Sequence, residues 1–164
     1  MEVATLLLQK IENRNLKKKM ITSLGNESAE KIVTLALDHK DSISLLLTLF
    51  DVIFEIADVL PTVFIHINSF IELFNLTIFH KNEKIRKSIT KAVNLISPLK
   101  LAKPIIKQLP RANNQYCDEY FSIMNDIAQS YSSQMMKIMF DSLSAKYKMN
   151  VKANLIDQLS FVPP

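Results

Sequence analysis

Apolar residues recur every three or four positions along most of the chain, which is the spacing of an amphipathic helix. Prolines, a single glycine and short polar stretches interrupt this pattern and mark helix ends. We expect about ten helices joined by short connections, at about residues 2–11, 15–24, 28–39, 41–60, 62–79, 82–97, 99–109, 116–130, 133–147 and 151–159. The pattern predicts an all-α fold.

The two most apolar helices carry their polar residues in narrow stripes. In 41–60 the stripe consists of Ser44, Thr48, Asp51, Glu55 and Asp58, and in 62–79 of His66, Ser69, Glu72 and Asn75. A helix that is apolar on most sides must be covered on most sides. These two helices are therefore expected at the centre of the fold.

Composition adds limits on the class of protein. A chain of 164 residues that is 48% hydrophobic can bury a core, so we expect one α-helical domain over residues 1–164, which can also be the N-terminal part of a longer protein. Gly25 is expected to end a helix with a positive φ. Cys117 is the only cysteine, which fits a reducing, intracellular location, cytoplasmic or nuclear, and a small core residue rather than a nucleophile.

Three short segments share a helical pattern. Asn82, Ile85, Arg86, Ile89, Ala92 and Val93 form the first, and Asn13, Leu16, Lys17, Met20, Ser23 and Leu24 the second. A fainter third consists of Val151, Lys152, Leu155, Gln158 and Leu159. The pattern resembles the inner helix of HEAT and armadillo repeats, often Asp/Asn-x-x-Val-Arg-x-x-Ala-x-x-Ala-Leu. The resemblance implies a short right-handed array of antiparallel helix pairs; an irregular multi-helix bundle is the alternative.

Charge is distributed unevenly along the chain. Residues 41–80 contain five acids and no lysine or arginine, whereas residues 81–111 contain nine basic residues and one acid, Glu83. Seven of these cations follow helical spacing opposite apolar residues: Lys84, Lys87, Lys91, Lys100, Lys103, Lys107 and Arg111. If consecutive helices stack, the seven cations form one surface, which we call the lysine ridge.

Two interpretations of the lysine ridge stay open. It is either the ordinary solvated side of two helices or a surface that binds an anionic partner, and the scarcity of compensating acids favours the second. Nucleic acid fits less well because no aromatic residue lies between His80 and Arg111, and because arginine is rare. An acidic protein partner fits at least as well.

Tyrosine and methionine gather in the last third of the chain. Tyr120, Met124, Ile127 and Tyr131 share one helix face, and Met135 and Met139 share another. Such side chains commonly fill cores, but they also form grooves that accept a partner's apolar helix. We therefore add Tyr120, Met124, Tyr131, Met135 and Met139 to the candidate partner-binding residues.

Signals of catalysis are sparse. The chain has no glycine-rich phosphate loop and no paired histidine or cysteine motif. We expect solvated helix faces to carry His66 and two groups of carboxylates, Asp51, Glu55, Asp58 and Asp118, Glu119, Asp126. We expect no cofactor, no metal, no catalysis and no membrane span. The sequence predicts a scaffold or adaptor that binds proteins, with nucleic-acid or acidic-ligand binding as the alternative; self-association stays open.

Overall fold

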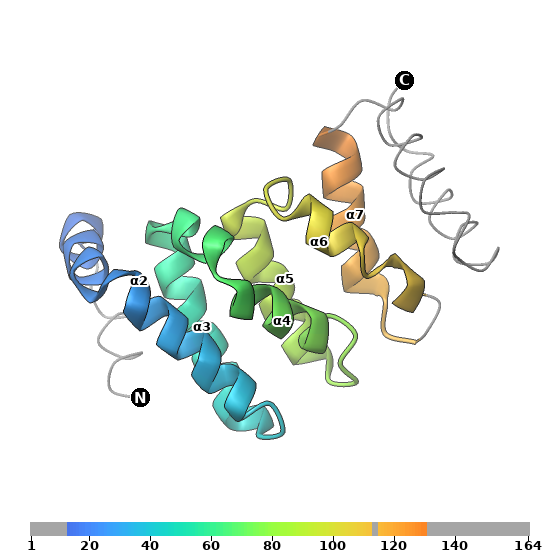
Figure 1. Ribbon diagram of the computed structural model, residues 1–164, viewed down its shortest axis with the longest axis horizontal. Coiled ribbons are helices and arrows are strands. Elements are labelled where there is room, and N and C mark those ends of the chain that lie inside the picture. Colours follow the sequence, from blue (N-terminus) through green and yellow to red (C-terminus); the bar gives the residue numbers. More distant parts are fainter. Residues whose placement is uncertain (1–12, 113–114, 131–164) are drawn as a thin grey trace. The chain divides into compact units, whose positions relative to one another are not determined.

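A computed structural model describes residues 13–112 and 115–130, and these contain eight helical segments and no strand. The helices, drawn in Figure 1, are α2 (Arg14–Asp38), α3 (Ile43–Val59), η1 (Pro61–His66), α4 (Asn68–Thr77), α5 (Glu83–Ile96), α6 (Ala102–Ile106), η2 (Leu109–Arg111) and α7 (Asp118–Ser130). The all-α prediction is confirmed for these residues. The helices expected at 2–11, 133–147 and 151–159 lie outside them, and the total of about ten stays a prediction.

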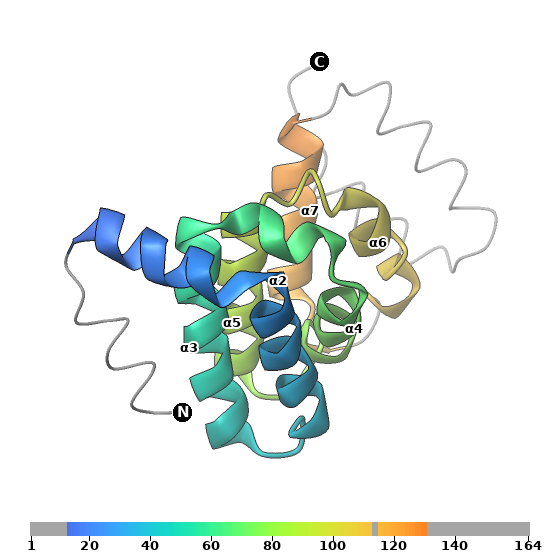
Figure 2. The same ribbon diagram turned by 60° about the vertical axis from the view of Figure 1, so that its left-hand side comes forward.

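The chain divides into two compact units, residues 1–97 and 98–164. In the first unit α3 packs against α2 on one side and α5 on the other, while α2 also packs against α4 (Figures 1 and 2). The result is two layers, α2 with α4 and α3 with α5. Large side chains without solvent contact fill the space between them, among them Leu46, Leu49, Ile53, Phe70 and Leu73. The predicted central position of the 41–60 helix is thus confirmed.

Helix α2 joins two predicted helices across a kink. Gly25 has φ 69° and ψ 176°, a combination that side chains disfavour, so the expected positive φ is confirmed while the helix resumes beyond it. Asn13 caps the start, and its side-chain oxygen accepts from the N–H groups of Asn15 (3.0 Å) and Leu16 (3.2 Å).

The first half of α2 buries a different side from the one expected. In the repeat-like pattern Leu16 and Met20 hold the apolar places that pack on a partner helix, but they are 50% and 41% exposed, while Ile21 is buried. Lys17, one turn before Ile21 on the same side, forms a partly buried ion pair with Glu55 of α3. Because successive helical residues point about 100° apart, facing Lys17 and Ile21 toward α3 turns Leu16 and Met20 away from it.

The single helix expected over 62–79 is wrong. A 3₁₀ segment, η1, is followed by an extended residue, Ile67 (φ −91°, ψ 105°), and by α4. The branched residues Val63, Ile65 and Ile67 favour extended backbone. The break also lets the Phe64 and Phe70 rings meet in the core, with centroids 5.3 Å apart. Two helical segments, η1 and α4, therefore take the place of the one expected helix.

The described part of the second unit contains α6, η2 and α7. The helix expected at 99–109 is shorter, since Pro104 lacks the N–H that a longer helix would need and the separate 3₁₀ segment η2, with Pro110 in its first turn, begins at Leu109. Its apolar side is buried as predicted: Leu101, Ala102, Ile105, Ile106 and Leu109. Helix α6 packs on α7, where the buried Tyr120 hydroxyl donates to the Ile105 carbonyl at 3.0 Å.

Candidate functional site

Helix α5 positions the first three cations of the lysine ridge. Asn82 caps the helix, because its side-chain oxygen accepts from the N–H of Lys84 at 2.9 Å. The predicted apolar side is buried: Ile85, Ile89, Ala92, Val93 and Ile96. Lys84, Lys87 and Lys91 lie on the exposed side. The amphipathic pattern read from the sequence is confirmed for this helix.

Two of these three lysines already interact within the unit. Lys87 pairs with Glu83 one turn earlier at 2.5 Å, and this hydrogen bond lowers the pKa of the Glu83 carboxyl. The ammonium of Lys91 lies 4.3 Å from the centre of the Phe54 ring, in cation–π geometry. Lys84 has no ion pair among the described residues. The α5 part of the ridge is therefore partly neutralised.

Arg86 points inward rather than toward the ridge. It is only 7% exposed, and its guanidinium donates to the carbonyls of His80 (2.8 Å) and Lys81 (3.2 Å) in the turn between α4 and α5. In the same turn His80 Nδ1 accepts from the N–H of Asn82 at 3.0 Å. Burial, aided by the charges of Lys81 and Arg86, lowers the pKa of His80 below its ordinary value of 6.5. Arg86 is a structural cation.

The second unit carries the other four cations. Lys100, Lys103, Lys107 and Arg111 are all exposed, and the sequence has no acid from Pro98 to Cys117. Arg111 donates to the Gln108 side chain at 3.1 Å, and partial burial lowers its pKa, although an arginine stays charged. We call Lys100, Lys103 and Lys107 the second-unit lysines. They form no ion pair with any residue in 13–112 or 115–130.

The seven cations are thus divided between the two units. Lys84, Lys87 and Lys91 belong to the first unit, and Lys100, Lys103, Lys107 and Arg111 to the second. Their exposed positions agree with the helical spacing in the sequence. That they form one continuous surface stays a prediction.

The tyrosine and methionine candidates have a different outcome. Tyr120 and Met124 are 0% and 1% exposed, so they fill the core of the second unit and are not available to a partner. Sequence spacing finds a shared helix face but cannot tell whether that face is covered. Tyr131, Met135 and Met139 lie outside the described residues.

The remaining polar candidates are dispersed. Asp51 and Asp58 are exposed as expected, whereas Glu55 pairs with Lys17, a contact between residues far apart in sequence that spacing alone does not predict. His66 is exposed. Cys117 is partly exposed at the start of α7, so its expected core position is wrong. Within the described part of the chain, no three of the His, Cys, Asp and Glu side chains group as metal ligands would.

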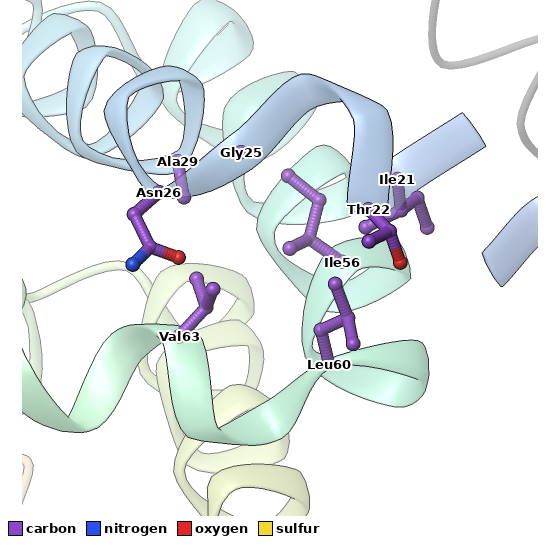
Figure 3. A pocket seen from close by; sticks show the side chains of 8 residues that line it. All are labelled: Ile21, Thr22, Gly25, Asn26, Ala29, Ile56, Leu60 and Val63. Atoms are coloured by element: carbon purple, nitrogen blue, oxygen red, sulfur yellow. The ribbon is translucent and has the colours of Figure 1, made fainter. Parts of the chain in front are cut away.

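A small cavity lies beneath the kink in α2 (Figure 3). Its volume is about 100 Å³, and Figure 3 shows α2 residues on both sides of Gly25 facing α3 and η1 across it. The lining residues are Ile21, Thr22, Gly25, Asn26, Ala29, Ile56, Leu60 and Val63. Ligand pockets commonly measure about 300–1,000 Å³. The cavity is smaller than that range and holds no cluster of charged groups, so we assign it to imperfect packing at the kink.

None of the described helices has the length and apolar character needed to cross a membrane. Since the other polar residues are dispersed and the cavity is small, the exposed lysines are the strongest candidate site in the described residues. Comparison of the chain with protein-family models, curated proteins and solved structures finds no match.

Proposed function

We propose that this chain is a protein-interaction module, a scaffold or adaptor, and that it binds rather than catalyses. The observation that carries the proposal is the exposure of all seven cations of the lysine ridge, beside apolar faces that are fully buried. Exposed cations in segments with few acids are suited to an anionic partner.

We further propose that the helices form a short HEAT/armadillo-like array. The layered packing of α2 with α4 and of α3 with α5 supports this arrangement, because repeat arrays stack equivalent helices side by side. The two repeat-like segments agree in part. Asn13 and Asn82 both cap a helix, and Lys17 and Arg86, which occupy the same place in the pattern, both point inward. Leu16 and Met20, however, are exposed where Ile85 and Ile89 are buried.

Copurification tests the scaffold function. The tagged full chain is purified from cells that express it, in parallel with a variant whose seven ridge cations are changed to glutamate. We expect one partner in fixed stoichiometry with the unmodified chain and its loss with the variant. A monodisperse monomer that retains no partner contradicts the proposal.

Nucleic-acid binding is the second candidate, favoured by the excess of basic residues over residues 81–111. Such binding would be electrostatic and would weaken steeply with salt. A fluorescent oligonucleotide should then bind at about 50 mM salt, and the salt dependence should shrink when Lys87, Lys91, Lys103 and Lys107 become glutamate. Absence of binding at that salt concentration excludes this candidate.

A further inference from the structure

We propose that the second-unit lysines, Lys100, Lys103 and Lys107, form the main docking surface for an acidic helical segment of a protein partner. The inference rests on the proposed interaction function and names the part of the lysine ridge that does the binding. It also names the chemistry of the partner.

The existing contacts of each lysine decide between the two halves of the ridge. On α5, Lys87 is held by Glu83 and Lys91 by the Phe54 ring, so a partner would have to compete with contacts already made. The second-unit lysines have no described ion pair, and no acid stands nearby in sequence. An acidic partner therefore gains more from the second unit than from α5.

Spacing determines the form of the partner. The second-unit lysines follow one another at three and four residues, and the side opposite them is anchored on α7 through Ile105 and Tyr120. Lys103 lies in α6, whereas Lys100 is in the turn before the helix and Lys107 follows its last residue. At the rise of a helix or 3₁₀ turn, about 1.5–2.0 Å per residue, three or four residues span about 5–8 Å. Carboxylates three or four residues apart on a helix have the same spacing, about 5–6 Å. Acids at this spacing on a helix therefore suit the spacing of the three lysines along the chain.

An apolar side chain beside the lysines favours protein over nucleic acid. Leu99 precedes Lys100 and is 40% exposed, so it offers an apolar contact that a phosphate backbone cannot use. The segment has no aromatic ring for base stacking, and its single arginine, Arg111, already contacts Gln108. A partner helix with acids and one apolar residue can pair with the second-unit lysines and contact Leu99.

Fluorescence anisotropy with a defined peptide tests the inference on the full chain. The probe is a helical peptide of about 15 residues with glutamate at every third or fourth position and one leucine, and its control has glutamine in place of glutamate. We expect the acidic peptide to bind at about 50 mM salt and the control peptide not to bind. The variant K100E/K103E/K107E should lose at least about tenfold in affinity.

Charge reversals of matched size distinguish binding at the second-unit lysines from attraction by the net charge of the whole chain. K84E/K87E/K91E on α5, and K18E/K19E/K40E at exposed positions of the first unit, should each change affinity less than about threefold, because the proposed contacts do not involve these side chains. Equal losses in all three variants overturn the proposed site in favour of net-charge attraction. Leu99→Asn should weaken binding of the peptide but not of an oligonucleotide.

Two further outcomes would overturn the proposed docking surface, and a third would overturn only the scaffold function. Tighter binding of a single-stranded oligonucleotide than of the peptide at equal salt assigns the lysines to nucleic acid. If the copurified partner survives K100E/K103E/K107E, this site is wrong although the scaffold function holds. If no partner copurifies but the peptide binds as expected, the site stands and the scaffold function fails.

Discussion

At the scale of single residues, Arg86 shows how a cation in a basic segment can serve structure. Its guanidinium is buried and satisfies two carbonyls of the turn before α5. Arg86→Ala leaves those carbonyls without their donor, so we expect the free energy of unfolding to fall by about 1–3 kcal/mol. Urea denaturation measures the change, with the exposed Lys84→Ala as a control that should stay within about 0.5 kcal/mol. Equal losses in both variants contradict the structural role of Arg86.

His80, in the same turn, makes stability depend on pH. Its pKa is lowered in the folded chain, so just below the ordinary value of 6.5 the unfolded chain binds more protons than the folded one. This contribution is complete above about pH 6.5 and is lost as the pH falls through that value toward the lowered pKa. Melting temperatures between pH 7.5 and 5.5 should therefore decline less in His80→Asn than in the unmodified chain. The exposed His66→Asn is the control and should keep the decline of the unmodified chain; the same slope in His80→Asn shows that His80 is not responsible.

At the scale of an element, the cap of α5 was predictable from sequence and is present. Asn82→Ala removes the acceptor for the Lys84 N–H, and we expect a loss of about 0.5–2 kcal/mol of stability. Asn94, exposed within the same helix, provides the matched control, since Asn94→Ala should be neutral or slightly stabilising. Chemical denaturation of both variants distinguishes a capping loss from a general effect of removing an amide.

The kink in α2 gives a second prediction for an element. A methyl group at Gly25 would meet no atom within 4 Å, so the cost of Gly25→Ala comes from backbone strain at φ 69° alone. We expect a loss of about 1–3 kcal/mol, measured by thermal or urea unfolding. Ser23→Ala, at an exposed position two residues away, should change stability by less than about 0.5 kcal/mol. A neutral Gly25→Ala would mean that α2 adopts another backbone at the kink.

At the scale of the whole molecule, the surface charges should be reversible without loss of the folded core. The second-unit lysines are exposed and form no described ion pair, so K100E/K103E/K107E should melt within a few degrees of the unmodified chain, at about 0.5 kcal/mol or less per site. Circular dichroism during heating measures this. A cooperative transition at much lower temperature would show that these lysines stabilise the second unit, and a binding loss could then not be assigned to the docking surface.

Local patterns determined much of this protein. Helical spacing of apolar residues placed α3, α5 and α7 and assigned the buried side of α5; Asn82 and Gly25 have the predicted cap and positive φ. The reason is that helix formation, capping and burial of one face depend on residues within a few turns of each other. The exposed positions of the ridge cations follow from the same periodicity.

Tertiary structure decided what depends on distant residues. The break at Ile67 lets Phe64 and Phe70 meet in the core, and the pair of Lys17 and Glu55 brings together two helices. Tyr120 and Met124 belong to the core because other parts of the second unit cover their face, which no spacing in α7 can indicate. Likewise, Lys87 and Lys91 have contacts that the second-unit lysines lack among the described residues, which separates cations that look alike in the sequence. Periodicity fixes the direction of a side chain, whereas its neighbours are fixed by packing.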